Sequence, residues 1–387
     1  MSKKIIYCLL IINSITIAQS NVNPDISLIG TFNTYTNFIK DSPEYGKLNF
    51  EMPSFELFID GYLNPYARAT ANIAFEDEQF NAEEIYANIV RGLPLDIQIK
   101  AGKYLLEFGK LNLLHPHAWP FINRPLYHQI YFGEEGFNDI GANFSFILPT
   151  QDFYTTLDLG VYKGDAISND TGDTGGEDSD PYDVRGNSPI FVGRLGSFFS
   201  IGDFNNLDIG LSSSYGIYAK SSFYIPDSVG FPSRMLKYFY EGLDFKFKYK
   251  PESYTSLVIQ GEAILNNRDV IRGTDVEPVV QTISTYGAFI YFDYQFFKQF
   301  SVGAKYDFTY GVIGDEPSIN TLANDDINKT QGIEYWIGYY PIEETLALRL
   351  DAQHLFFDLE DNMEGDPETT ITLQLVFSLG PHKAHQF

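Results

Sequence analysis

The chain has 387 residues, of which 44% are hydrophobic and 16% aromatic, with 27 tyrosines and 33 phenylalanines against only 4 methionines. Its formal net charge is −25. So acidic a surface repels nucleic acid, whose binding depends on neutralised phosphates, and we expect no nucleic-acid partner. This length allows either two or three soluble domains or one large barrel, and the aromatic content favours the barrel.

The first twenty residues, Met1 to Ser20, have the organisation of a cleaved secretory signal. Lys3 and Lys4 precede an apolar run from Ile5 to Ile12, and small residues follow it. A membrane-anchoring helix is the alternative interpretation, but the run is too short for one. Without the two lysines, 24 basic residues face 51 acidic ones, so the mature chain carries a net charge of −27.

The only cysteine, Cys8, lies inside this segment, so we expect no disulfide in the mature protein. No apolar run after residue 20 approaches the roughly 18 residues that a spanning helix needs. A membrane crossing by this chain therefore requires a closed barrel.

The rest of the chain contains short runs of alternating polar and apolar residues, the signature of membrane-barrel strands. We predict sixteen of them, and an even number is typical of bacterial single-chain barrels. The runs are Ile26–Phe38, Phe50–Leu63, Ala67–Glu76, Glu84–Val90, Leu95–Lys103, Ile140–Leu148, Phe153–Lys163, Ile190–Phe199, Leu207–Tyr218, Tyr238–Tyr249, Thr255–Leu265, Thr282–Tyr294, Ser301–Tyr310, Gly332–Tyr340, Leu346–Phe357 and Thr369–Leu379.

The predicted connections alternate in length. After even-numbered runs they are short and turn-like, as in Asn64-Pro65-Tyr66 and Arg91-Gly92-Leu93-Pro94. After odd-numbered runs most are long, including 164–189, 219–237, 266–281 and 311–331. Short turns at one end and long loops at the other are typical of outer-membrane barrels.

Alternation also assigns the two faces of each strand. In the last run, Ile371, Leu373 and Leu375 fall on one face, and Thr372 and Gln374 fall on the other. An uncharged apolar face backed by a charged one fits lipid outside and water inside. A soluble antiparallel protein with one packed face is the alternative, but this sequence predicts no helices that could cover the apolar faces of the strands. The inward charges that we expect to line the pore are Arg68, Lys100, Arg194, Asp244, Lys246, Lys248, Asp307, Arg349 and Asp351.

The segment from Tyr104 to Asp139 has neither strand alternation nor a sustained helical period. Structureless segments of this length inside a compact unit are usually functional. We expect it to fold into the barrel opening as a constriction loop. The residues expected to narrow the pore sterically are Trp119, Phe121 and Tyr127, and those expected to act electrostatically are Lys110, Arg124, Glu134 and Glu135.

The stretch from Ala101 to Pro149 resembles a family of bacterial outer-membrane proteins related to the phosphate-selective porins O and P. The similarity lies in its Gly-Lys, Phe-Gly-Lys, His-Pro-His and Gly-Glu-Glu-Gly elements, and it extends to Asn23–Gly30, Leu63–Glu76 and Phe377–Phe387. Members are often labelled zinc-regulated or TonB-dependent receptors. The resemblance implies a porin-like barrel in the outer membrane, a pore lined by the third external loop, and a homotrimer.

Histidines cluster in the loop, at His115, His117 and His128, and at the C-terminus, at His382 and His385. A His-x-His pair in an extended segment places both imidazoles close enough for one Zn²⁺, and His128, Glu134 or Glu135 could add a ligand. Packing against Trp119 and the other aromatics is the alternative role for these histidines. The acidic stretch Asp165–Asp183 lacks the spacing of an EF-hand calcium loop, so we interpret it as a solvated outer loop.

No nucleophile elbow, phosphate loop or metalloprotease motif occurs, so we expect no enzyme. The sequence predicts an all-β, single antiparallel transmembrane barrel over residues 21–380, followed by a tail at 381–387. We expect a passive outer-membrane channel for small hydrophilic solutes or ions, surrounded by lipid and without a resident cofactor. Two alternatives stay open: a zinc-linked uptake protein or receptor using His115, His117 and His128, and a structural surface barrel that the loop plugs shut.

Overall fold

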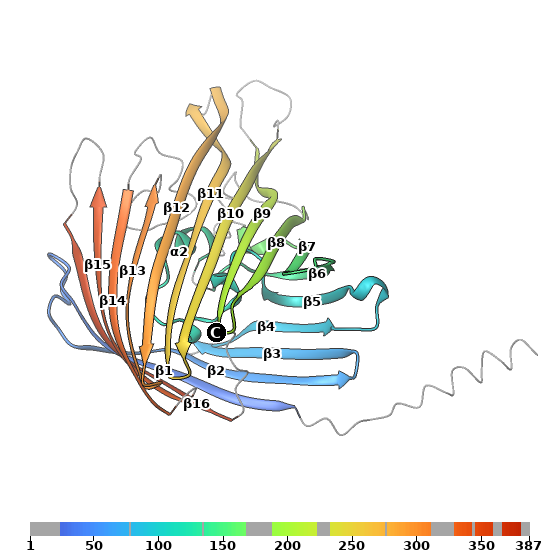
Figure 1. Cartoon of the computed structure of the whole chain (residues 1–387). Helices are drawn as coiled ribbons and strands as arrows, with labels where there is room; N and C mark the ends of the chain where they lie inside the picture. Colours follow the sequence, from blue (N-terminus) through green and yellow to red (C-terminus); the bar gives the residue numbers. More distant parts are fainter. Residues whose placement is uncertain are drawn as a thin grey trace, which may run out of the picture.

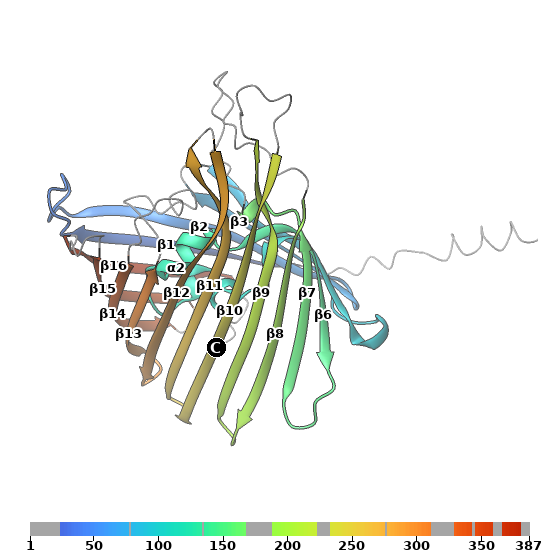
Figure 2. The same cartoon turned by 90° about the horizontal axis from the view of Figure 1, so that it is seen from above.

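The computed structural model describes residues 24–76, 79–133, 135–167, 188–222, 233–274, 277–310, 329–342, 345–358 and 366–380. Sixteen antiparallel strands close into one barrel, and the short helix α2 (Leu126–Phe132) lies inside the ring (Figures 1 and 2). The predicted fold class is confirmed. The strands are β1 Asp25–Asn37, β2 Asn49–Asn64, β3 Ala67–Glu76, β4 Gln79–Ile89, β5 Gln98–Leu105, β6 Asn138–Leu148, β7 Tyr154–Tyr162, β8 Ile190–Ile201, β9 Asn205–Ser222, β10 Ser233–Glu252, β11 Thr255–Thr274, β12 Glu277–Phe296, β13 Phe300–Tyr310, β14 Lys329–Ile342, β15 Leu346–Asp358 and β16 Glu368–Leu379.

Every strand pairs with its neighbours in sequence, and the last strand closes the ring on the first. The closing register runs from Leu28 opposite Leu379 to Asn37 opposite Thr370. Closure leaves no open edge, so each strand finds hydrogen-bond partners on both sides. Within the described ranges, no helix is long and apolar enough to cross a membrane.

The alternation along the strands separates an apolar outer face from a polar lumen. Leu350 is 50% exposed, whereas its neighbour Asp351 is 1% exposed. The same contrast separates Leu243, 52% exposed, from Asp244, 1% exposed. The outer face is therefore an apolar surface suited to lipid tails, and the charged residues gather inside.

Two predicted long loops are wrong. We expected loops at 219–237 and 266–281, but β9 continues to Ser222, β10 begins at Ser233, and β11 and β12 extend to Thr274 and Glu277. The β11–β12 extension pairs in continuous register, for example Arg268 opposite Ile283, and the β9–β10 extension pairs with one register shift between Leu236 and Lys237. They project past the other strands as long ribbons (Figure 1). Their sequence lacks an apolar face, so hydrophobic alternation cannot reveal them.

Other strand boundaries also differ, among them those of the fourth and fifth runs. The fifth predicted run began at Leu95, but Pro94–Asp96 form the 3-10 turn η1 and β5 starts at Gln98. The fourth run began at Glu84, but β4 starts earlier, at Gln79. Several predicted features lie outside the described residues: Met1–Ser20, Glu134, most of Asp165–Asp183 and of the 164–189 loop, nearly all of the 311–331 loop, and the tail at 381–387 with His382 and His385.

Candidate functional site

The connection between β5 and β6, residues 106–137, turns inward and lies within the barrel (Figure 1). Along it come two 3-10 turns, η2 (Leu111–Leu113) and η3 (Pro116–Ala118), and then α2. Its two ends are held together by Asn112, whose amide donates to the carbonyls of Leu106 (2.8 Å) and Phe137 (3.0 Å) and accepts from the Phe137 N–H (2.8 Å). The buried side-chain amide of Asn112 thus links the first and last residues of the loop.

The loop packs its aromatic side chains against an aromatic sector of the inner wall. Phe121 lies 5.2 Å from Tyr291 and 5.8 Å from Trp336, between ring centroids. Tyr127 stacks on Phe289 at 5.9 Å. Burying a large apolar side chain contributes roughly 1.5–3 kcal/mol, so these contacts favour the inward position of the loop. The predicted constriction residues Trp119, Phe121 and Tyr127 are all at most 2% exposed and belong to this cluster.

Carboxylates of the inner wall then fix the loop backbone. Glu262 on β11 accepts hydrogen bonds from the backbone N–H groups of Lys110 (3.0 Å) and Leu111 (2.6 Å) and from the Tyr127 hydroxyl (2.8 Å). Burial and the charge of Glu262 raise the pKa of Tyr127 well above its ordinary value, so the hydroxyl stays a donor. Gly109 has φ +66°, and a Cβ there would lie 2.5 Å from the Glu262 carboxylate, so this approach requires glycine.

A second group of wall carboxylates holds the turn before α2. Glu334 on β14 accepts from the N–H groups of Ile122 (3.1 Å) and Asn123 (3.0 Å), and Asp307 on β13 accepts from the N–H of Leu126 (3.2 Å). Lys305 pairs with Glu334 and donates to the Asn123 carbonyl. These ionic groups are fully buried and serve to seat the loop.

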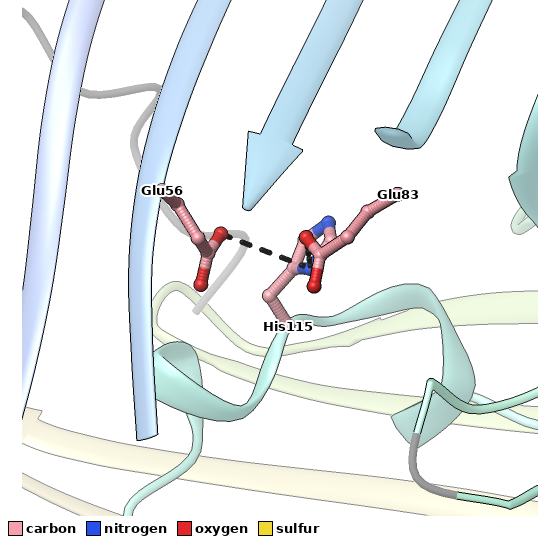
Figure 3. A group of neighbouring side chains, drawn as sticks. All are labelled: Glu56, Glu83 and His115. Atoms are coloured by element: carbon pink, nitrogen blue, oxygen red, sulfur yellow. Dashed lines mark ion pairs between the residues drawn. The ribbon is translucent and has the colours of Figure 1, made fainter. Parts of the chain in front are cut away.

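The third attachment of the loop joins its residues His115 and His117 to carboxylates of the opposite wall, on β2 and β4. His115 lies between Glu56 on β2 and Glu83 and Glu84 on β4, and Figure 3 shows the carboxylates of Glu56 and Glu83 directed at its ring. The closest contacts are 3.4 Å from Nδ1 to Glu83 and 3.2 Å from Nε2 to Glu84. Burial lowers the pKa of His115, but the hydrogen bond to Glu84 and the charges of the three carboxylates outweigh it and raise the pKa to about 10. His117 stacks parallel to His115 at 5.8 Å and contacts Glu56 at 3.0 Å.

His128 lies apart from this cluster, in the helix α2. Its Nδ1 accepts a hydrogen bond from Arg124 at 2.8 Å, and its ring packs edge-on against Trp119 and Phe132. Burial and the charge of Arg124 lower its pKa well below the ordinary value, so the ring is neutral. The contacts of His128 are with Arg124, Trp119 and Phe132 and not with the cluster of His115 and His117, so the predicted metal site of these three histidines stays a prediction.

Below the loop, a cavity of about 270 Å³ extends toward the end of the barrel that carries the short turns. Its upper surface is formed by loop residues, among them Leu111, His117 and Trp119. The wall supplies five cationic side chains and one carboxylate: Lys246, Lys248, Lys250, Lys298, Arg349 and Asp293. Although the whole chain is strongly acidic, this end of the lumen is basic.

The predicted pore-lining and constriction residues fall into several groups. Arg68 pairs with Asp60, Arg194 pairs with Asp244 at 2.6 Å, and Lys100 lies 3.6 Å from Glu107. Arg349, Asp307 and Asp351 contact the loop, whereas Lys246 and Lys248 line the cavity. Lys110 pairs with Asp208 at 2.9 Å, Arg124 lies over the Trp119 ring, and Glu135 is 3.6 Å from Lys103 near the loop end.

Sequence reasoning missed the pair Glu83 and Glu84 as partners of the loop. Strict alternation would direct adjacent residues to opposite faces. The register shifts here, since Asn72 is opposite Glu84 and Ile73 is opposite Ala82, which leaves Glu83 as the extra residue of a β-bulge. The bulge lets both carboxylates reach the lumen. Two adjacent glutamates after the apolar–polar run of β3 were the only available sequence signal.

No family model matches the chain. An uncharacterized protein of Aquifex aeolicus is 29% identical over an alignment of 394 positions, which covers 96% of this chain and 81% of that protein. Among solved structures, the outer membrane channel DcaP of Acinetobacter baumannii has a TM-score of 0.56 at 13% identity, covering 94% of this chain and 99% of DcaP. The anion-selective porin from Comamonas acidovorans has a TM-score of 0.55 at 12% identity, covering 93% of this chain and 100% of that porin. The chain therefore shares the fold of outer-membrane porins, while the relation to phosphate-selective porins O and P stays a prediction.

Proposed function

We propose that the protein is a passive channel of the bacterial outer membrane for small hydrophilic solutes, narrowed by the loop at 106–137. The observation that carries the proposal is the position of this loop. It crosses the lumen from Glu56 and Glu84 on one wall to Glu262 and Glu334 on the other. Passage through such a barrel needs no chemical step. Its selectivity depends on pore width and on the charges that line the pore.

Within this proposal, anions pass more easily than cations. The cavity between the loop and the short-turn end is lined by five basic side chains and one carboxylate. Rings of one charge sign set the preference of a pore for ions of the opposite sign. The net charge of −25 counts all surfaces, whereas a permeating ion meets only the local lining.

Single-channel recording in planar bilayers tests both statements. Purified protein should give discrete open steps, and the reversal potential in a KCl gradient should show preference for chloride. A silent barrel would contradict the channel and favour a structural surface role for a plugged barrel. Open steps with potassium preference would contradict only the anion statement. The homotrimer implied by the resemblance is part of the proposal, and conductance steps in groups of three would support it.

A further inference from the structure

We infer that Glu56, Glu83 and His115 bind a divalent transition-metal ion, of which Zn²⁺ is the natural probe, and that this ion fastens the loop to the barrel wall at β2 and β4. The site is independent of whether the protein conducts. It differs from a site made of loop histidines alone, because two of its three ligands belong to the wall.

The donor atoms already converge. One oxygen of Glu56, one oxygen of Glu83 and the Nδ1 side of His115 offer ligand atoms that all lie within 4.8 Å of one another. Glu56 comes from β2, Glu83 from the bulge in β4, and His115 from the residue before η3. At ordinary zinc ligand distances of about 2.0–2.2 Å, two ligand atoms lie at most about 4.4 Å apart, so a small contraction of this triangle would close it on an ion.

Glu84 completes the arrangement from the other side of the ring. Its carboxylate is 3.2 Å from Nε2 of His115, opposite the nitrogen that faces Glu56 and Glu83. Histidines that bind metals usually donate their second N–H to a carboxylate, which fixes the tautomer and orients the ring. The bulge at Glu83 therefore supplies one ligand and one orienting partner from two consecutive residues.

The side chain of Asn72 provides an independent indication of a cation site. Its side chain is 0% exposed, and its Nδ2 lies 2.9 Å from Glu56 and 2.6 Å from Glu83, at the centre of the cluster. Its Oδ1 is buried without a hydrogen-bond partner among the described residues. Buried polar atoms are rarely left without a partner. Rotation of this amide would turn the oxygen toward a bound cation as a further ligand.

Charge and ligand type define the ion. Three carboxylates surround one imidazole, and all the ion pairs that Glu56 and Glu84 form within the described part of the chain are with His115 or His117. A dication would neutralise this excess of negative charge. One nitrogen ligand among oxygen ligands suits Zn²⁺ or another first-row ion better than Mg²⁺ or Ca²⁺, which prefer oxygen alone.

Metal analysis of the full-length protein in detergent tests the inference. Dialysis against ZnCl₂ followed by elemental analysis should give one Zn²⁺ per chain. Calorimetric titration should show affinity reduced roughly 10- to 100-fold in Glu84→Gln, which removes the orienting partner. Glu83→Gln and His115→Gln should abolish saturable binding. His354→Gln, which changes a histidine on β15 away from the cluster, serves as the matched control and should bind as wild type.

The double variant His382→Gln/His385→Gln separates this site from the C-terminal tail. Binding that disappears in this variant and persists in Glu83→Gln would overturn the inference, as would a wild-type protein that retains no zinc. X-ray absorption of the zinc-loaded wild type avoids dependence on variants that fold poorly. It should show one imidazole among oxygen ligands, and two or more imidazoles would contradict the site. Conductance recorded with and without a chelator reports on the channel separately.

Discussion

Glu83 and Glu84 are consecutive in sequence, yet both carboxylates contact His115, at 3.4 Å from Nδ1 and 3.2 Å from Nε2 respectively. The β-bulge in β4 makes this geometry available. Strands β2 and β4 thereby hold one part of the loop. Hydrogen bonds to carboxylates on β11, β13 and β14 hold other parts of it. The loop is attached to both sides of the lumen, and its attachments can be tested one by one.

Deleting residues 106–136 should raise single-channel conductance about twofold or more, because the loop occupies lumen that ions would otherwise fill. The strands on either side, β5 and β6, pair with each other and with β4 and β7, so the barrel should still close. Equal conductance of the deletion variant and the wild type would contradict the statement that the loop constricts the pore.

Glu262→Ala should loosen the first part of the loop. The change removes the acceptor for two backbone N–H groups and the Tyr127 hydroxyl, at a cost of about 1 kcal/mol for each hydrogen bond. Limited proteolysis should then cut within residues 106–114 faster than in the wild type, and open-channel current should become noisier. Glu252→Ala, at the exposed end of β10, is the control and should change neither. Unchanged cleavage in Glu262→Ala would show that Glu262 is not needed to hold this part of the loop.

Replacing Lys246, Lys248 and Lys250 together by glutamine should shift the reversal potential toward cation preference, because two cationic side chains and Asp293 then remain in the cavity. The effect should weaken at high salt, where the screening length falls to about 3 Å at 1 M. Replacing Lys40, an exposed residue that pairs with Asp366, should leave selectivity unchanged. If the triple variant kept the wild-type reversal potential, the basic cavity would not lie on the ion path.

Acidification should destabilise the loop through His128. Burial and Arg124 hold the pKa of this imidazole well below its ordinary value of about 6.5. Below pH 6.5 the unfolded chain therefore binds a proton that the folded chain excludes. The stabilisation is fully present above pH 6.5 and is lost as the pH falls, by up to about 1.4 kcal/mol per pH unit.

The measurement is the Tm in detergent at pH 7.5 and at pH 5.5 for the wild type and for His128→Gln. The wild type should lose more thermal stability on acidification than the variant, whose side chain does not titrate. Identical pH dependence of the two proteins would assign the acid sensitivity to other groups.

Much of the fold could be predicted from local pattern. Alternation with period two revealed sixteen strands, since lipid on one side and water on the other impose opposite chemistry on successive side chains. The pattern failed where strands β9 to β12 extend beyond the apolar zone, because backbone pairing and polar contacts such as that between Thr282 and Asp269 hold the strands together there. It failed again at Glu83, because one extra residue reverses the assignment of faces.

The sequence by itself determined the barrel, the inward polar face and the identity of the long third loop, because each depends on residues close together in the chain. Only the tertiary structure decided what that loop touches. Asn123 meets Glu334 across 211 residues of sequence, and His115 meets Glu84 rather than His128. Contacts across a closed lumen depend on how far around the ring each strand lies and on where a bulge shifts the register, and neither is encoded by residue spacing alone.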